Sequence, residues 1–300
     1  MPSLRSKFCR FIIKFVVASK FDPNMPIDKA RKTMEDFSRF LRLPRKTHVE
    51  TVALGNLAAD WVFFGDAPGD KAILYLHGGG YSLGSTRTHR ELAAYVAKYS
   101  GARVLLPDYR LAPENPFPCA LDDAVFAYHW LLGQGIACGN IAIAGDSAGG
   151  GLAIALAVAL RDAGDPAPAA IACMSPWTDL AVTGDSIATN AAVDPVLNAA
   201  SIKRMAAAYI GQADARLPLI SPLYAYFSGL SPLLIHVGTD EMLLDDSKRI
   251  AEKARRAGVD VTLKIYDRMW HVFHLNVRAM PEAKKAVKAF GAFIREHCGG

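Results

Sequence analysis

The chain has 300 residues, of which 51% are hydrophobic and 21% are charged, a composition within the range of ordinary globular proteins that bury a large core. The net charge of +5 is spread along the chain without a dense block of lysine and arginine. The sequence therefore indicates no nucleic-acid-binding surface.

The N-terminal segment is predicted to be an amphipathic helix over residues 4–16. Its apolar side carries Leu4, Phe8, Phe11, Ile12, Phe15 and Val16, opposite Arg5, Lys7, Arg10 and Lys14. Lys14 interrupts the apolar run that an export signal would need. We expect the apolar side to pack over the body of the protein, and weak contact with a membrane surface is the alternative. No uncharged stretch is long enough to span a bilayer.

A second amphipathic helix is expected to begin near Pro26 and to end before Pro44, with Ile27, Ala30, Met34, Phe37 and Leu41 on one side. Residues 1–45 are therefore predicted to form a helical cap region. The rest of the chain, residues 46–300, is predicted to form one α/β domain.

From Lys71 onward the chain alternates short apolar runs with longer helical patterns, which is typical of a mostly parallel sheet flanked by helices. Strands are expected at residues 48–54, 59–64, 72–76, 103–107, 141–144, 169–174, 233–237 and 261–266. Helices are expected at residues 87–99, 120–132, 148–163, 245–257 and 281–296. Residues 180–219 break the alternation, and we interpret them as a cap insertion with one helix at 199–209.

Five cysteines, Cys9, Cys119, Cys138, Cys173 and Cys298, form an odd set with no CxxC pair and no histidine at metal-ligand spacing. This pattern predicts neither a disulfide framework nor a zinc site. A reducing compartment fits best, so we expect the protein to be cytoplasmic.

The most specific motif is Gly145-Asp146-Ser147-Ala148-Gly149, a G-x-S-x-G in which an expected strand runs directly into a long alanine-rich helix. A serine on such a sharp turn has a strained backbone, and the flanking glycines allow close approach of the chain. The helix N-terminus behind it offers unpaired N–H groups to a developing negative charge. Ser147 is thus predicted to be a nucleophile.

A second motif, His77-Gly78-Gly79-Gly80, follows the expected strand 72–76. Consecutive glycines let backbone N–H groups point into a site, where they can stabilise the oxyanion of an acyl-transfer intermediate. With a serine elbow in the same chain, the expected donors are Gly78, Gly79 and Gly80 together with Ala148, the residue after the nucleophile.

These motifs resemble the hormone-sensitive-lipase-like family of α/β-hydrolases, particularly its bacterial esterases. The resemblance extends to Asp108-Tyr109-Arg110-Leu111-Ala112-Pro113-Glu114, Ser175-Pro176-Trp177-Thr178-Asp179-Leu180 and Ser221-Pro222-Leu223, in the expected order. It implies an α/β-hydrolase fold, a catalytic Ser, Asp and His in that chain order, a cap over the site, and dimers formed through the last strand and helix. A homodimer is thus one expected assembly.

Two histidines, His271 and His274, follow the last expected strand. The base must lie on a loop at the carboxyl end of the sheet, where it can take the serine proton. His271 matches the position where the family has His-Gly-Phe, although Val272 replaces the glycine here. We predict His271 as the base and keep His274 as the alternative.

The acid is expected after strand 233–237, where several carboxylates occur. Asp240 fits the family's first Asp in this stretch and is predicted to orient the histidine, with Glu241 as its main competitor. Asp245 and Asp246 lie at the start of an expected helix, where capping explains them.

Other polar residues are first interpreted as structural. Asp108, Arg110 and Glu114 are expected to form a network that holds a loop beside the site, and Asp146 to support the elbow. His77 is interpreted as a loop anchor. Asp194 and Asn198 could contact substrate or cap a helix.

The predicted activity is hydrolysis of small carboxylic esters of short to medium acyl chains through an acyl-enzyme, without metal or cofactor. Lactone hydrolysis, deacetylation and amide hydrolysis by the same residues remain alternatives, as does a binding protein that has lost catalysis. The expected partner is a small-molecule ester.

Overall fold

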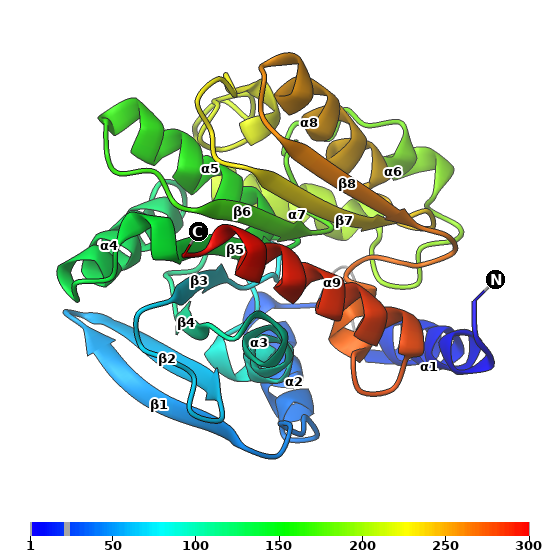
Figure 1. Ribbon diagram of the computed structural model, residues 1–300. Coiled ribbons are helices and arrows are strands. Elements are labelled where there is room, and N and C mark those ends of the chain that lie inside the picture. The colour runs from blue at the N-terminus through cyan, green and yellow to red at the C-terminus, as the bar shows by residue number, and fades with distance from the viewer. Residues whose placement is uncertain (1, 21–24, 300) are drawn as a thin grey trace.

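The computed structural model describes residues 2–20 and 25–299, and it is built around one eight-stranded sheet (Figure 1). The strand order is β1-β2-β4-β3-β5-β6-β7-β8; β1 and β2 run antiparallel to their neighbours, and the other pairs are parallel. The strands are β1 (Thr47–Leu54), β2 (Leu57–Phe64), β3 (Ala72–Leu76), β4 (Arg103–Pro107), β5 (Ile141–Asp146), β6 (Ala170–Met174), β7 (Leu233–Gly238) and β8 (Val261–Tyr266). The expected α/β class is confirmed.

The central strands are apolar throughout because both faces of the sheet are covered. Along β3, Leu74 and Leu76 belong to the core on one face, whereas Ile73 and Tyr75 belong to the core on the other. All five β3 residues are buried. This pattern is what a parallel sheet between two helical layers requires.

Two layers of helices supply those cores (Figure 1). Residues of α3 (Thr86–Ser100) and α9 (Pro281–His297) pack on one face of the sheet. Residues of α4 (Cys119–Gly133), α5 (Ala148–Ala163) and α8 (Leu244–Arg256) pack on the other. The carboxyl ends of the parallel strands meet at one edge, which is where open α/β sheets place their ligands.

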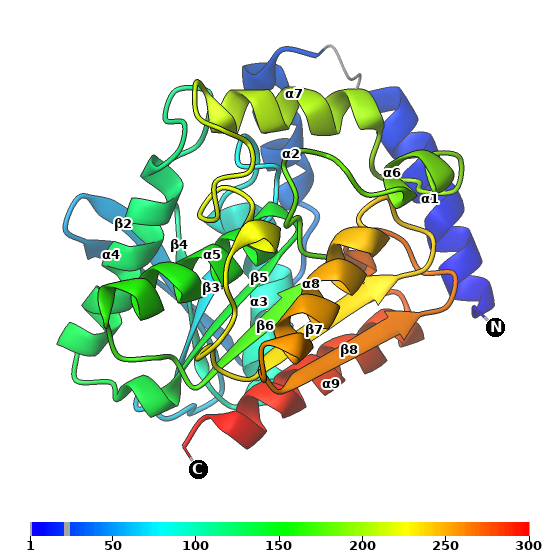
Figure 2. The same cartoon turned by 90° about the horizontal axis from the view of Figure 1, so that it is seen from above.

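The helices outside the two layers lie near that edge. They are α1 (Leu4–Lys20), α2 (Ile27–Ser38), α6 (Ser186–Thr189) and α7 (Ala199–Ile210), and short 3₁₀ turns occur at η1 (Cys138–Asn140), η2 (Pro222–Tyr224) and η3 (Phe273–Asn276). Figure 2 shows α7 and α1 at the rim of the molecule. Residues 180–219 therefore contain α6 besides the expected α7, and α2 ends at Ser38, before Leu41 of the expected helix.

The orientation of α1 differs from the prediction. Its apolar side chains Leu4, Phe8, Phe11 and Phe15 are 66% to 83% exposed, whereas Ser6 is buried. Polar contacts explain the rotation: the Arg10 guanidinium on the inner side donates to the Asp240 carboxylate and to the carbonyls of Val193 and Arg268. The helix is thus docked through the side that carries Ser6, Cys9, Arg10 and Ile13.

Within residues 2–20 and 25–299, no helix is long and apolar enough to cross a membrane.

Candidate active site

Ser147 lies at the turn between β5 and α5. Its backbone has φ 53° and ψ −123°, a left-handed conformation that is rare for a residue with a side chain. Two hydrogen bonds hold the turn: the Ser147 N–H donates to the Met174 carbonyl at 2.9 Å, and the Trp177 N–H donates to the Ser147 carbonyl at 2.8 Å. The sharp strand-to-helix turn predicted at Ser147 is therefore formed.

Glycine is needed on both sides of this turn because the backbones are in close approach. A Cβ on Gly149 would lie 2.0 Å from the Leu76 carbonyl oxygen, and one on Gly145 would lie 2.3 Å from the Gly149 carbonyl oxygen. Such distances exclude any side chain without movement of β3.

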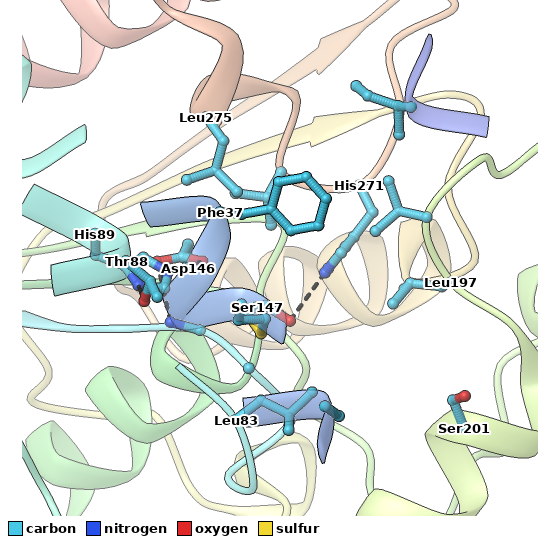
Figure 3. A pocket seen from close by; sticks show the side chains of 18 of the residues that line it. Phe37, Leu83, Thr88, His89, Asp146, Ser147, Leu197, Ser201, His271 and Leu275 are labelled. Carbon is cyan, nitrogen blue, oxygen red and sulfur yellow. Dashed lines mark hydrogen bonds and ion pairs between the residues drawn. The ribbon is translucent and has the colours of Figure 1, made fainter. Parts of the chain in front are cut away.

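His271 faces Ser147 directly (Figure 3). Its Nε2 lies 2.9 Å from Ser147 Oγ, the distance of a hydrogen bond through which a proton can pass. The ring is buried, with 5% of its surface exposed. The turn after β8 that carries it is fixed by the Asp240 N–H, which donates to the Met269 carbonyl at 2.9 Å.

The carboxylate beside the histidine belongs to Glu241. Its Oε1 lies 3.5 Å from His271 Nδ1. Among the described residues, neither of these two atoms has a hydrogen-bond partner, so each is left facing the other. The other oxygen of Glu241, Oε2, accepts from the Gly238 N–H at 2.9 Å. The carboxyl group is thus anchored on one side and faces the imidazole on the other.

Asp240, which the sequence analysis placed beside the histidine, points to a different neighbour. Its carboxylate accepts from Arg10 Nη1 at 2.7 Å and from the Thr239 hydroxyl at 2.9 Å. Adjacent residues in this turn point to opposite sides, so Glu241 faces inward and is fully buried while Asp240 faces α1. The longer glutamate side chain reaches the histidine from one residue further along the chain.

Ser175 connects the acid with the histidine loop, a role that the sequence analysis did not assign. Its hydroxyl donates to Glu241 Oε2 at 2.8 Å and accepts from the Val272 N–H at 3.1 Å. The residue is fully buried and has φ 50°. Its position in the Ser-Pro-Trp motif after β6 was the only sequence signal that could have drawn attention to it.

The pKa of His271 reflects two opposing influences. Burial lowers it, because a charged imidazolium loses hydration. The Glu241 carboxylate, with smaller contributions from Asp194 and Asp146, outweighs burial and raises the pKa above its ordinary value of 6.5. The surrounding carboxylates therefore stabilise the imidazolium form of His271, which is the form produced if the ring takes a proton from Ser147.

His274, the alternative base, lies in a different environment. Its Nε2 is 3.3 Å from His236 Nδ1, and the ring packs on the Phe273 ring. Burial lowers the pKa of His274 to about 3. Its contacts are those of a core histidine, and only His271 reaches Ser147.

The glycine loop after β3 lies next to the serine. Gly79 and Gly80 have φ 124° and 61°, values that glycine adopts readily. The Gly78 N–H donates to Asp146 Oδ1 at 3.2 Å, whereas the N–H groups of Gly79, Gly80 and Ala148 have no acceptor in the described part of the chain. Three backbone donors are therefore available around Ser147.

Asp146 joins this loop to the elbow. Its Oδ1 also accepts from the Tyr75 hydroxyl at 2.9 Å, and its Oδ2 lies 3.5 Å from His89 Nε2. Burial raises the pKa of Asp146, but His89, Tyr75 and His77 outweigh burial and lower it overall. A charged carboxylate thus supports the position of the glycine loop.

His77, whose pKa burial lowers to about 3, stacks on Tyr109 as a loop anchor.

The remaining predicted polar residues have structural contacts. Asp194 accepts from the N–H groups of Met242, Val196 and Leu197. Asn198 caps α7 by accepting from the Ser201 N–H at 2.8 Å.

The expected network of Asp108, Arg110 and Glu114 is divided between other partners. Arg110 pairs with Asp123 at 2.7 Å, and Glu114 pairs with Arg31 of α2 at 2.8 Å. Glu114 thus helps to hold α2, which the sequence pattern did not indicate.

A cavity of about 500 Å³ opens over the serine. Gly78, Gly79, Gly80, Ser147 and His271 line it at the base. The walls are mostly apolar and come from α1, α2, α7, η3 and the loop before α7; they include Ile13, Val16, Met34, Phe37, Leu197, Ile202, Met205 and Leu275. Figure 3 shows Phe37, Leu197 and Leu275 around Ser147 and His271. In the described ranges, no three side chains of His, Cys, Asp or Glu converge as metal ligands would. The arrangement suits an apolar molecule that places a carbonyl group beside Ser147.

Comparison with known proteins agrees with this geometry. The family model described as alpha/beta hydrolase fold matches residues 73–275. The chain is 45% identical over 250 residues to an acetyl-hydrolase of Streptomyces hygroscopicus, covering 83% of each chain.

Two solved structures are also similar over the whole chain. An esterase from the bacterial hormone-sensitive lipase family has a TM-score of 0.95 and 41% identity, with both chains covered fully. The esterase EstE5, from a crystal soaked with p-nitrophenyl butyrate, has a TM-score of 0.94 and 44% identity, with 99% of this chain and 100% of that chain covered. The chain therefore belongs to the hormone-sensitive-lipase-like family of α/β-hydrolases and is a carboxylic ester hydrolase.

Proposed function

We propose that this protein hydrolyses small esters of short to medium acyl chains through Ser147, His271 and Glu241. His271 takes the proton of Ser147 as the hydroxyl attacks the ester carbonyl, and it then protonates the leaving alcohol. Water, activated by the same histidine, releases the acid from the acyl-enzyme. The observation that supports this proposal most strongly is the alignment of Ser147 Oγ, the two nitrogens of His271 and Glu241 Oε1.

Glu241 is proposed as the acid in place of Asp240. An acid in this role must accept from the second nitrogen of the imidazole, so that the first nitrogen is free to take the serine proton. Glu241 faces that nitrogen, whereas the Asp240 carboxylate is engaged by Arg10. Asp240 then helps to attach α1 to the acid loop.

The oxyanion is proposed to be bound by the N–H groups of Gly79, Gly80 and Ala148. Gly78, expected to join them, donates to Asp146 and is assigned a supporting role. Donors already aimed at the developing charge cost no reorganisation during the reaction, and loss of one typically slows an enzyme about 10²- to 10³-fold.

The acyl-chain preference follows from the cavity. Its volume of about 500 Å³ and apolar walls suit a short to medium chain together with a small alcohol. The helices of residues 1–45 and of the insertion 180–219 are proposed to act together as the cap that closes it. We expect kcat/KM on p-nitrophenyl esters to peak between acetate and octanoate and to fall for palmitate. A maximum at palmitate would contradict the assignment.

Removal of acetyl groups is a second candidate, favoured by the 45% identity to a protein named acetyl-hydrolase, and the acetyl group could be carried by oxygen or by nitrogen. The same residues can attack an amide, whose amine leaving group needs a proton from His271. Matched pairs of p-nitrophenyl acetate and p-nitroacetanilide distinguish the two activities. A kcat/KM for the anilide within tenfold of that for the ester would favour the amidase.

Assembly and location remain proposals. β8 lies at the edge of the sheet, where its unpaired backbone can join the same strand of a second copy to form a homodimer. Light scattering on the purified chain distinguishes monomer from dimer. A cytoplasmic location stays a prediction from the cysteine pattern.

The pH dependence of hydrolysis should report His271. Only the neutral imidazole can take the serine proton, and Glu241 raises the pKa of His271 above 6.5. We therefore expect kcat/KM to fall as the pH decreases, with a midpoint above pH 6.5. In Glu241→Gln the midpoint should move to lower pH, because the neutral amide no longer stabilises the imidazolium. An unchanged midpoint would argue against this carboxylate as the neighbour of the base.

Ser175→Ala should reduce kcat without a comparable change in KM. The hydroxyl holds Glu241 and the Val272 N–H, so its loss leaves two buried polar groups with fewer partners. We expect a fall in kcat of about tenfold and a loss of about 1–3 kcal/mol in the free energy of unfolding. A kcat equal to that of the wild type would show that Ser175 does not position the acid.

A further inference from the structure

The outer face of α1, defined by Leu4, Phe8, Phe11, Ile12 and Phe15, is an exposed apolar stripe. These residues follow the spacing i, i+4, i+7, i+8, i+11, which places them on one side of a helix. They are 42% to 83% exposed. A contiguous row of three exposed phenylalanines is unusual for a surface in contact with water alone and marks an interaction site.

The charges around this stripe have one sign. α1 contains no Asp or Glu. At 100° per residue, Lys7 and Lys14 flank the stripe on one side and Arg5 flanks it on the other. All three are exposed, and none forms an ion pair with a carboxylate of the described residues. The outer face of α1 is thus apolar along its centre and positive along both margins.

The opposite side of the same helix borders the active site. Ile13 and Val16 line the cavity over Ser147. Arg10 is bonded to Asp240, the residue before Glu241, and the Ser3 hydroxyl donates to Glu282 of α9 at 3.0 Å. One helix therefore separates the substrate cavity from the surface that carries the stripe, and Figures 1 and 2 both place this helix at the edge of the molecule.

An anionic lipid surface complements this face better than a second copy of the chain does. In a symmetric dimer through the outer face, each α1 would meet another helix that has cations and no carboxylate. A bilayer offers apolar tails to the stripe and negative headgroups to its margins. The helix is about 25 Å long, which lets its whole stripe lie in the plane of the interface.

We propose that the outer face of α1 binds the surface of an anionic lipid bilayer and brings the cavity next to the lipid phase. Apolar esters dissolved in the membrane then reach Ser147 past Ile13 and Val16. This delivery rests on the proposed function, whereas the binding itself does not.

Co-sedimentation with vesicles tests the binding. The vesicles are an equimolar mixture of ether-linked phosphatidylcholine and phosphatidylglycerol, because ether lipids exclude any effect of hydrolysis. The full-length wild type should partition onto them, and Phe8→Ser/Phe11→Ser/Phe15→Ser should bind at least about tenfold more weakly. Lys7→Gln/Lys14→Gln should lose about fivefold per lysine, and the wild type should bind vesicles of phosphatidylcholine alone far less.

Matched controls remove side chains of the same type elsewhere. Phe126→Ser/Tyr226→Ser and Lys248→Gln/Lys288→Gln change exposed residues of other elements and should bind as the wild type does. Turnover of p-nitrophenyl butyrate in water is measured for each variant. Retained turnover with lost binding supports the proposal, and absent turnover in the wild type would instead count against the proposed function.

Two results would overturn the inference. The first is a wild type that does not bind anionic vesicles although it turns over the soluble ester. The second is an oligomer in light scattering that the triple phenylalanine variant dissociates, because the outer face of α1 would then be an interface between copies.

Discussion

Ser147→Ala should reduce kcat for p-nitrophenyl butyrate by about 10⁴-fold or more. The variant has no hydroxyl to form the acyl-enzyme, and removal of a triad nucleophile leaves only the rate enhancement due to binding and the oxyanion donors. Among residues 2–20 and 25–299, Ser147 Oγ forms a hydrogen bond with His271 alone, so the variant should fold normally. Steady-state kinetics and thermal unfolding on the same preparation test both statements.

Ser228→Ala is the matched control, because it removes the same hydroxyl from an exposed loop. Its kcat and KM should equal those of the wild type. Should Ser147→Ala keep more than a few per cent of wild-type kcat, another nucleophile would have to act, and the elbow would be a structural turn.

The second large effect on kcat is expected from substitution of Glu241, whereas substitution of the neighbouring Asp240 should have little effect. Glu241→Gln should reduce kcat by about 10³- to 10⁴-fold, because an amide in place of the acid favours the wrong tautomer of His271. Asp240→Asn should keep kcat within about threefold. It loses only a partly exposed ion pair with Arg10, and such pairs contribute about 0.2–1 kcal/mol to stability. Kinetics of the two variants, side by side, distinguish the roles.

The opposite ranking would restore Asp240 as the orienting acid. Equal losses of kcat in both variants would mean that catalysis depends on both carboxylates of this loop. The contact between Glu241 and His271 would then not explain the loss. Substitution by Gln and Asn keeps the volume of each side chain, so a difference in packing does not enter the comparison.

The sheet and its helices could be predicted because their signals are local. Strands β3 to β8 are apolar runs bounded by turns, and helices such as α5 follow directly from a strand. The turn at Ser147 could be predicted equally well, because it requires Gly145 and Gly149 on both sides. A Cβ at either position would clash with the backbone. Patterns of this kind depend on residues a few positions apart.

The identity of the residue that faces His271 depends on long-range contacts. Asp240 and Glu241 are adjacent carboxylates after the same strand, and the sequence does not show which one points inward. That choice is made by Arg10, 230 positions away, and by Ser175, which follows the neighbouring strand β6. The rotation of α1 has the same origin, because the polar partners of Arg10 outweigh burial of the phenylalanines.

Rapid quenching of the wild type with p-nitrophenyl butyrate, followed by mass mapping of peptides, tests whether Ser147 forms the acyl-enzyme. We expect a transient butyryl group on the peptide that contains Ser147, and this group should accumulate when deacylation is slower than acylation. The same treatment of Ser147→Ala should leave that peptide unmodified. Ester turnover with a butyryl group on another residue, and none on the peptide that contains Ser147, would contradict nucleophilic catalysis by Ser147.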